Sequence, residues 1–423
     1  MEIFELEKFN NWWNTGQVKE ELLKSFKRDI YDDIKKYISL RQIILLYGLR
    51  RMGKTTLMFQ IINELLKNSD SKNIFYFSFD ERIFDLKEVL DNYQKLILGK
   101  TFDSTKETIY LFFDEIQKVE DWESKIKIYY DLYPKVKFFL SGSASVSLRK
   151  KSKESLAGRI FSFLIPPLSF EEFLKMKGKD MDKIKSNMNL WSRDLLPLFY
   201  QYMKFGSFPE LATIENEDIA KKYLIENVVD RIIYKDLPEE FEIKDLELLK
   251  NLVYLLGKNP GMTINYHEIA KNLGKDQRTI SNYFEYMEFG LLIKFIFNYR
   301  GSPLASYRKS KKVYFTTPNL TFAFNDNLEK VFPFMLENIV LLKTNAKFFY
   351  KNGFEVDFVV EKENELIGIE VKSENFKIKQ LKNFVKKFGR KAKKCFIVDI
   401  EKETKIENFE VIPAWKFLLQ SFK

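Results

Sequence analysis

Cysteine and histidine are almost absent from this chain. Among its 423 residues there is one cysteine, Cys395, and one histidine, His267. A single cysteine excludes an internal disulfide and any zinc site built from several cysteines. A single histidine excludes histidine-rich metal sites and histidine relays, and it argues against a serine triad. Because Cys395 precedes the apolar residues 396–398, we expect it to belong to the core.

Long apolar runs are also missing. No segment approaches the roughly 18 consecutive apolar residues that a membrane-spanning helix requires. Residues 1–7 lack the basic start of a secretory signal. We therefore expect a cytoplasmic protein without a membrane partner.

The charge balance is basic. The chain carries 70 Lys and Arg residues against 60 Asp and Glu residues, which gives a formal charge of +10 and a pI near 9.1. This excess favours an anionic partner such as nucleic acid, although the lysines are spread along the chain. A length of 423 residues exceeds what one core usually organises, so we expect several domains.

A complete phosphate-binding loop follows the first strongly apolar run. Residues 43–47 (IILLY) are typical of a buried parallel strand, and apolar residues recur at helical spacing over residues 57–66. Between them the sequence matches G-x-x-x-x-G-K-[ST]. The candidate nucleotide-binding residues are Gly48, Leu49, Arg50, Arg51, Met52, Gly53, Lys54, Thr55 and Thr56.

Each residue type in this loop has a physical role in binding a triphosphate. Gly48 and Gly53 permit a tight turn that aims backbone N–H groups at phosphate oxygens, and the following helix adds its positive dipole end. We expect Lys54 to reach the β- and γ-phosphates and the Thr55 hydroxyl to coordinate Mg²⁺. A plain glycine turn between a strand and a helix is the alternative. Because no suitable guanine-reading Asn/Thr-Lys-x-Asp element is found, ATP with Mg²⁺ is favoured over GTP.

Two carboxylates end a second apolar strand, residues 109–113. At this strand end Asp114 can hold Mg²⁺ through its water shell, and Glu115 can orient and polarise the water that attacks the phosphate. An acidic pair in such a position also occurs as a helix cap or a turn. Since a phosphate loop precedes it, we predict that Asp114 binds the metal and that Glu115 and Lys54 are catalytic.

A third apolar run, residues 136–140, ends in Ser141-Gly142-Ser143. If this strand lies between the other two, a serine hydroxyl stands beside the γ-phosphate, which makes Ser141 or Ser143 the candidate catalytic sensor. A serine-rich turn that caps the next helix is the alternative. With a further apolar strand at residues 74–78, the series predicts a parallel sheet with right-handed crossovers.

Further motifs extend the pattern along most of the chain. Besides the phosphate loop with its two arginines, they are Asp114-Glu115-Ile116-Gln117, Ser141-Gly142-Ser143, Leu156-Ala157-Gly158-Arg159, Pro167-Leu168-Ser169-Phe170 and Gly206-Ser207-Phe208-Pro209-Glu210. Together they resemble a large archaeal and bacterial family of AAA+-type ATPases. The resemblance suggests that Arg159 is a finger that completes the site of a neighbouring subunit in a homo-oligomer. Pairing of Arg159 with an acidic residue of its own chain is the alternative.

Between residues 245 and 297, apolar residues recur as three helices and a strand-like segment follows. This order is typical of a winged helix-turn-helix. Gln277, Arg278, Thr279 and Asn282 fall on the exposed side of the third helix, where such side chains can contact bases or phosphates. We predict them as DNA contacts, with a packing or protein-contact module as the alternative.

Two neighbouring strand patterns near the C-terminus carry acidic residues. The period of two residues in Glu370-x-Lys372 places both side chains on one face, where they can meet Asp357 around Mg²⁺ or Mn²⁺. Lys372 would orient the attacking water or stabilise charge on phosphate, and Glu337 could supply a further metal ligand.

This arrangement resembles the PD-(D/E)xK nucleases, and the ATPase family named above carries a domain of that kind at its C-terminus. Val356-Asp357 replaces the proline-aspartate pair of the pattern, a replacement that the superfamily tolerates. The resemblance suggests a nuclease site made of Glu337, Asp357, Glu370 and Lys372. Two amphipathic strands with solvated charges, or a nuclease fold that has lost catalysis, are the alternatives.

The combined prediction is an α/β protein with an AAA+-like P-loop NTPase core and a parallel sheet. A helical lid, a winged helix-turn-helix and a small nuclease-like α/β domain follow. The leading hypothesis is ATP hydrolysis coupled to DNA binding and cleavage, and the alternative is a nucleotide-driven adaptor whose nuclease-like domain is inactive. The expected boundaries are residues 1–175, 176–240, 241–325 and 326–423.

Overall fold

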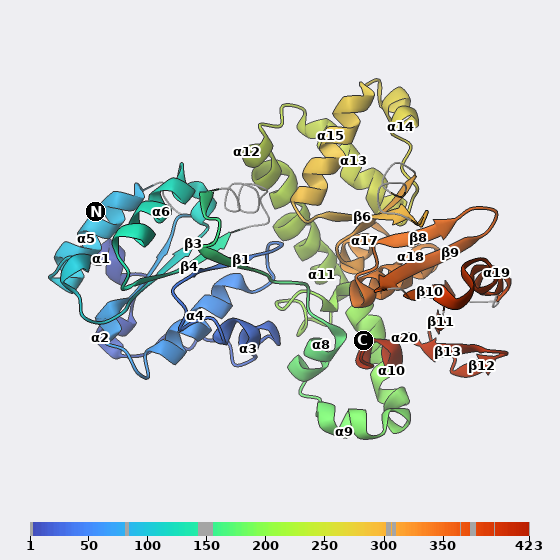
Figure 1. Ribbon diagram of the computed structural model, residues 1–423, viewed down its shortest axis with the longest axis horizontal. Helices are drawn as coiled ribbons and strands as arrows, with labels where there is room; N and C mark the ends of the chain where they lie inside the picture. Colours follow the sequence, from blue (N-terminus) through green and yellow to red (C-terminus); the bar gives the residue numbers. More distant parts are fainter. Residues whose placement is uncertain are drawn as a thin grey trace. The chain divides into compact units, whose positions relative to one another are not determined.

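The computed structural model of the protein describes residues 3–80, 84–142, 155–301, 306, 310–363, 365–372, 378–392 and 394–422. The chain forms two compact units, Met1–Pro166 and Pro167–Lys423 (Figure 1). The first unit ends at Pro166, whereas the sequence suggested a domain boundary after residue 175. No helix in the described ranges combines the length and apolarity that crossing a bilayer requires.

A five-stranded parallel sheet organises the first unit. Its strand order is β2-β3-β4-β1-β5, and every neighbouring pair runs parallel. The strand that precedes Ser141 therefore lies between the strands that precede the phosphate loop and Asp114, as the sensor hypothesis requires. The strands are β1 (Ile43–Tyr47), β2 (Ile74–Ser78), β3 (Ile109–Asp114), β4 (Val136–Gly142) and β5 (Ile160–Leu164).

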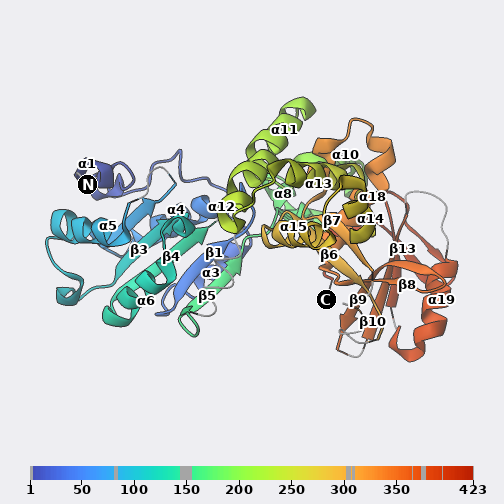
Figure 2. The same cartoon turned by 90° about the horizontal axis from the view of Figure 1, so that it is seen from above.

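Helices cover both faces of this sheet (Figure 2), because a parallel sheet must bury both of its faces. The apolar residues of β1 to β4 are almost completely buried, and the core on the side of α5 and α6 combines aliphatic with many aromatic side chains. The helices are α3 (Ile30–Lys35), α4 (Lys54–Leu65), α5 (Leu86–Tyr93) and α6 (Trp122–Leu132), with single turns at η1 (Ser71–Asn73), η2 (Gln94–Leu98), η3 (Phe102–Ser104) and η4 (Ile116–Lys118).

The N-terminal segment is bound to the outer strand, β2. The fully buried Asn10 donates through Nδ2 to the carbonyl of Tyr76 at 2.8 Å and accepts the N–H of Tyr76 at 2.7 Å. The indole of Trp12 donates to the carbonyl of Ile74 at 3.0 Å. These side chains satisfy backbone groups that an edge strand otherwise presents to other chains. The segment contains α1 (Ile3–Glu7) and α2 (Trp12–Thr15).

The second unit begins with a run of helices in the region where the sequence predicted a helical lid. Three of these helical segments are π-helical, with hydrogen bonds between residues five apart. The elements are α8 (Phe170–Met176), α9 (Met181–Ser186), η5 (Met188–Trp191), α10 (Ser192–Gln201), η6 (Tyr202–Gly206), α11 (Glu217–Tyr223), η7 (Leu224–Val229), η8 (Ile232–Asp236) and α12 (Leu237–Phe241).

Three further helices and a strand hairpin follow. α13 (Leu246–Lys258), α14 (Tyr266–Leu273) and α15 (Gln277–Phe289) precede β6 (Ile293–Asn298) and β7 (Lys311–Phe315), which pair antiparallel. Thr263, between α13 and α14, forms an isolated bridge with Lys312 of β7.

The hairpin belongs to an eight-stranded mixed sheet with the order β12-β13-β11-β10-β9-β8-β6-β7. Because β6 pairs with β8, the sheet continues across residue 325, where the sequence suggested a domain boundary. The remaining elements are α17 (Pro318–Phe324), α18 (Leu328–Thr344), β8 (Phe348–Lys351), β9 (Glu355–Lys362), β10 (Glu365–Lys372), α19 (Lys379–Phe388), η9 (Gly389–Lys391), β11 (Lys394–Asp399), β12 (Thr404–Ile406), β13 (Phe409–Pro413) and α20 (Ala414–Leu419).

Candidate functional site

The phosphate loop joins β1 to α4, which begins at Lys54. A Cβ at Gly48 would lie 2.5 Å from the carbonyl oxygen of Ile165, so only glycine permits this close approach. Gly53 and Arg51 have φ angles of 87° and 65°, in the left-handed region. The loop therefore takes the tight conformation that its glycines predicted.

Lys54 is folded back over this loop. Its side chain is buried, and Nζ donates to the carbonyls of Gly48 and Leu49, both at 3.1 Å. The buried Arg28 donates to the carbonyl of Met52 at 2.9 Å and so ties down the opposite side of the loop. Arg28 belongs to no local sequence motif, so its contact with the loop could not be predicted from the sequence.

Asp114 lies at the centre of a network of hydroxyl groups. Thr55 Oγ1 donates to Asp114 Oδ2 at 2.6 Å, and Ser141 Oγ donates to Asp114 Oδ1. The hydroxyl of Tyr76 on β2 donates to Asp114 Oδ2 at 3.0 Å. Burial, and then the charge of Asp114, raise the pKa of Tyr76 well above its ordinary value. The structure thus brings together Thr55, Asp114 and Ser141 as predicted, and it adds Tyr76.

Glu115 directly follows this network. Its backbone lies in the left-handed region, with a φ of 52°, so its side chain leaves the line of β3. The amide Nε2 of Gln117 donates to Glu115 Oε2, which fixes the orientation of the carboxylate. In the sequence Gln117 is recognisable only as the last residue of the Asp114-Glu115-Ile116-Gln117 motif, which does not predict this contact. Ser143, the other candidate sensor, lies outside the described residues.

The donor set of this loop fits a magnesium-bound triphosphate. A buried lysine ammonium stands over a loop of backbone N–H groups, and this arrangement suits phosphate oxygens. A threonine hydroxyl and a carboxylate are hydrogen-bonded to each other at the adjacent strand end, and oxygen ligands of this kind suit Mg²⁺.

Arg159 precedes β5, at the end of the sheet opposite the phosphate loop. Parallel pairing aligns Ile43 with Ile160, whereas the loop follows the other end of β1. The Arg159 guanidinium contacts Asp131 of α6 through two hydrogen bonds, at 2.9 and 3.2 Å. This pairing lowers the pKa of Asp131 and raises that of Arg159. The own-chain pairing considered as the alternative is therefore present.

The predicted DNA contacts lie near the start of α15. Gln277 and Arg278 are exposed, whereas Thr279 and Asn282 are half-buried. Asp276 caps this helix by accepting the backbone N–H of Arg278 at 2.7 Å. Arg278 and Asn282 lie on the side of the helix opposite the buried Ile280, Phe284 and Met287, whereas Gln277 precedes Phe284 by seven residues and therefore lies on the buried side, where it is exposed as the first residue of the helix.

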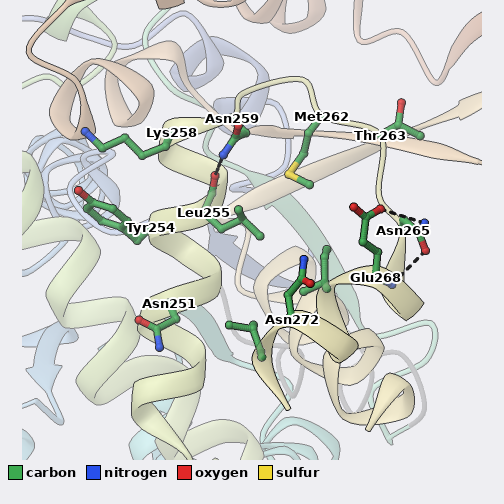
Figure 3. Close-up of a pocket in the computed structure, with 12 residues that line it drawn as sticks. Asn251, Tyr254, Leu255, Lys258, Asn259, Met262, Thr263, Asn265, Glu268 and Asn272 are labelled. Atoms are coloured by element: carbon green, nitrogen blue, oxygen red, sulfur yellow. Dashed lines mark hydrogen bonds between the residues drawn. The ribbon is translucent and has the colours of Figure 1, made fainter. Parts of the chain in front are cut away.

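A pocket of about 570 Å³ lies between α13 and α14 (Figure 3). Its lining combines apolar side chains such as Leu255 and Ile269 with several asparagines. Asn259 donates to the Leu255 carbonyl at 2.9 Å, and Asn265 contacts Glu268 at the rim. None of the residues that sequence analysis proposed as functional lines this pocket.

The C-terminal charged residues meet on β9 and β10. Lys372 Nζ lies 2.9 Å from Glu370 Oε2 and 3.7 Å from Asp357 Oδ2. Asp357 also accepts the backbone N–H of Val371 at 2.8 Å. The Oε1 atom of the buried Glu370 has no hydrogen-bond partner within the described part of the chain. The sequence correctly predicted that these three side chains converge.

The charge of Asp357 acts on Glu337 of α18, and the contacts of Glu337 and Glu355 add two side chains that the sequence did not assign to this site. The Tyr314 hydroxyl donates to Glu337 Oε2 at 2.6 Å, and Lys312 lies 2.7 Å from Glu355 Oε1. Both Lys312 and Tyr314 come from β7. We call the charged group of Glu337, Glu355, Asp357, Glu370, Lys312 and Lys372 the carboxylate cluster.

Burial and mutual charge interactions shift the pKa values of several groups in the carboxylate cluster. Burial, and then the charge of Asp357, raise the pKa of Glu370 to about 8 and that of Glu337 to about 7. Burial alone would lower the pKa of Lys372, but Asp357 and Glu370 raise it above its ordinary value. In the described residues no set of three His, Cys, Asp or Glu side chains is arranged to hold a metal ion. In this structure the ammonium of Lys372 forms ion pairs with both Asp357 and Glu370 and so lies between the two carboxylates.

Three family profiles match the chain. A profile described as an AAA domain covers residues 40–174, and two described as domains of unknown function, DUF8612 and DUF4143, cover residues 196–327 and 334–417. The AAA match coincides with the parallel sheet and its phosphate loop.

Relatives match over nearly the whole chain. The uncharacterized protein MJ1544 of Methanocaldococcus jannaschii is 32% identical over 424 residues, covering 92% of this chain and 90% of the relative. An uncharacterized protein of Haemophilus influenzae is 27% identical over 388 residues, covering 88% and 93%.

Among solved structures, the chain aligns with CDC6P from Pyrobaculum aerophilum at 13% identity and a TM-score of 0.29, covering 76% of this chain and 98% of that one. Because this TM-score is low, the fold assignment rests on the strand order and the phosphate loop. The chain belongs to the same family as MJ1544, and its N-terminal unit is an AAA-type P-loop domain.

Proposed function

We propose that the chain binds ATP with Mg²⁺ at the phosphate loop and hydrolyses it. The observation that carries this proposal is the network around Asp114, because it joins one hydroxyl from the loop, Thr55, to one from β4, Ser141. The bound magnesium ion would neutralise charge on the phosphates.

The residues of the site divide the work. Lys54 and the backbone N–H groups of the loop bind the phosphates, and Thr55 with Asp114 holds the magnesium ion and its water shell. Glu115 orients and polarises the attacking water, while Ser141 is placed to sense the γ-phosphate. Gln117 keeps the Glu115 carboxylate in one orientation.

Release of phosphate by the purified full-length chain tests this proposal. We expect turnover of ATP that requires Mg²⁺ and stops in EDTA, and GTP should compete poorly. Absence of magnesium-dependent turnover at any ATP concentration contradicts the proposal.

We further propose that Arg159 acts on the nucleotide of a neighbouring copy. Its position at the sheet end away from its own phosphate loop supports an action in trans, and its exposed ion pair with Asp131 is weak enough to exchange. Formation of the oligomer would then replace Asp131 by phosphate as the partner of the guanidinium.

Arg159→Ala should lower hydrolysis at least 10-fold and remove its rise with protein concentration, because arginine fingers contribute about 10³-fold or more in related phosphoryl transfers. Asp131→Asn is the matched control, since it breaks the same ion pair but leaves the arginine available, and it should retain activity. Phosphate release per chain, measured across protein concentrations, checks both variants. Equal losses in both would identify Arg159 as a loop anchor.

A second candidate function belongs to the C-terminal part. We propose that Asp357 and Glu370 bind Mg²⁺ or Mn²⁺, with Glu337 as a further ligand, and that this site cleaves DNA. The carboxylate cluster supports this, because Asp357 and Glu370 lie side by side on β9 and β10 and the buried Glu370 Oε1 has no hydrogen-bond partner among the described residues, an arrangement of oxygens that suits a divalent cation. Metal binding would require Lys372 to release one carboxylate and turn toward the phosphate.

DNA would be held in part by α15. The order α13, Thr263 bridge, α14, α15, β6 and β7 corresponds to that of a winged helix-turn-helix, whose third helix contacts DNA. The basic residues Arg308 and Lys309 of the intervening loop lie outside the described residues. The competing proposal is an adaptor in which the carboxylate cluster binds a partner and cleaves nothing.

Cleavage of plasmid and single-stranded DNA, with Mg²⁺ or Mn²⁺ and with or without ATP, separates these proposals. Asp357→Asn should abolish cleavage, at least 100-fold, while ATP turnover remains, because Asp357 is a metal ligand in this proposal. Glu361→Gln is the matched control on the same strand and should cleave normally. Intact ATP turnover without any cleavage by the native chain favours the adaptor.

A further inference from the structure

The strongest charge imbalance of the chain lies in one short segment that the proposed functions leave unused. Residues 377–394 contain nine Lys or Arg residues and no Asp or Glu, whereas the formal charge of the whole chain is +10. This segment includes α19, η9 and the first residue of β11. We call its seven described basic residues the α19 patch: Lys379, Lys382, Lys386, Lys387, Arg390, Lys391 and Lys394.

All seven side chains of the α19 patch are exposed. Lys382 pairs with Glu407 at 2.6 Å, and Lys387 lies 5.2 Å from the ring centroid of Tyr350. The other five have no acidic partner among the described residues. Such an accumulation of uncompensated charge is unfavourable in the isolated protein and attracts a polyanion.

The spacing of the lysines arranges them along a line. Lys379, Lys382 and Lys386 recur at i, i+3 and i+7, so they share one face of α19. At a rise of 1.5 Å per residue, this stripe is about 10 Å long. η9 and the start of β11 extend the positive charge beyond the C-terminal end of the helix.

The opposite face of α19 is not available to a partner. Leu381 and Phe384 are fully buried, and Val385 and Phe388 pack against the same core. Gly368 of β10 permits this close packing, because a Cβ there would lie 3.1 Å from the ring of Phe384. A helix that inserts into a membrane needs a free apolar face, which α19 lacks. Its partner must therefore be recognised by charge.

We propose that the α19 patch is a nucleic-acid-binding surface that contacts the phosphate backbone of DNA. A linear row of cations complements the regularly spaced phosphates of a strand, and such contacts are independent of sequence. α19 packs on β9 and β10, the two strands that carry Asp357, Glu370 and Lys372 (Figure 1). The patch therefore supplies a backbone-binding surface on the framework of the carboxylate cluster.

This inference depends neither on ATP hydrolysis nor on cleavage. It also locates DNA binding on a different element from α15, so the two surfaces can be tested separately. Failure of the cleavage experiment would leave the inference intact, because binding is measured directly and in EDTA.

The test is binding of a fluorescently labelled duplex DNA of about 30 base pairs to the full-length chain, measured by anisotropy across salt concentrations. The triple variant Lys379→Gln, Lys386→Gln, Arg390→Gln should bind at least 10-fold more weakly at the lowest salt. The slope of log K against log salt should become shallower by about 2.7, because each lost phosphate contact removes about 0.9. Lys391→Gln with Lys394→Gln should give a smaller loss in the same direction, of about 1.8 in slope.

The matched control removes three exposed lysines from the other unit: Lys95→Gln, Lys100→Gln, Lys106→Gln. It changes the net charge equally and should leave the salt slope unchanged. Arg278→Ala reports on α15 and, if both surfaces bind, should shift the slope by about 0.9 on its own. Thermal melting of each variant separates lost binding from lost folding, and the double variant remains informative if the triple variant unfolds.

Equal weakening by the control triple would overturn the proposal, because binding would then follow net charge alone. It would also be overturned if the native chain bound vesicles rich in phosphatidylserine but not duplex DNA. Unchanged DNA affinity in a folded triple variant would have the same consequence.

Discussion

Glu115→Gln is expected to bind ATP as tightly as the native chain and to hydrolyse it at least 100-fold more slowly. The amide has the same shape as the carboxylate and keeps the contact with Gln117, so the site stays assembled. It cannot accept a proton from the attacking water, and general-base catalysis is worth about 10²- to 10⁴-fold. Calorimetry with ATP and a phosphate-release assay measure the two quantities separately.

Glu120→Gln is the matched control for this experiment, because it removes an exposed carboxylate from the same loop. It should bind and hydrolyse ATP normally. If Glu115→Gln lost affinity in proportion to its lost turnover, Glu115 would be a binding residue and the proposed division of roles would be wrong.

Lys54→Ala is expected to lower ATP affinity about 100-fold. The ammonium is buried above the loop and donates to two of its carbonyls, a position from which it can contact phosphate oxygens held by the loop. A hydrogen bond to a charged group contributes roughly 1.5–3 kcal/mol, and each 1.4 kcal/mol changes an equilibrium constant tenfold. Equilibrium binding of a fluorescent ATP analogue measures the change.

Lys67→Ala provides the comparison, since Lys67 is an exposed lysine just beyond the end of α4. Its loss removes a surface ion pair with Glu64, which contributes little to stability or binding. Native-like affinity in Lys54→Ala would show that the loop binds phosphate through its backbone alone. That outcome would contradict the role proposed for the ammonium.

The first unit could be predicted largely from local sequence. A strand, a glycine loop and a helix are adjacent in the chain, so the positions of Gly48, Lys54 and Thr55 follow from order alone. The alternation of apolar runs also predicted the α/β class and the parallel sheet, which the structure confirms. The sequence prediction that Ser141 or Ser143 is a sensor required β4 to lie between β1 and β3, and the structure has this order, which brings Ser141 to Asp114.

Two residues of the site could not be predicted from the sequence, because their contacts join segments that are far apart in the chain. Tyr76 was part of an apolar strand pattern, and only the pairing of β2 with β3 brings its hydroxyl to Asp114. Arg28 precedes the first strand of the sheet and reaches the phosphate loop through folding of the whole unit. Nothing within a short window of sequence distinguishes either residue from its neighbours.

In the C-terminal part, the pairing of charged residues on β10 could be predicted from the sequence, but the contacts that β7 makes with them could not. The two-residue period of β10 correctly placed Glu370 beside Lys372. The contribution of β7 through Lys312 and Tyr314 depends on tertiary contacts, which periodicity does not encode. The basic spacing of α19 was present in the sequence, whereas the burial of its opposite face required the structure.

The pairing of β6 with β8 has a consequence for how this protein could have evolved. A domain that shares no sheet with its neighbour can be exchanged between proteins by recombination at the linker that joins them. A chain cut near residue 325 would instead expose the backbone of β8 and strip Lys312 and Tyr314 from Glu355 and Glu337. The helices α13 to α15 and the carboxylate-bearing strands are therefore expected to be inherited as a single genetic unit.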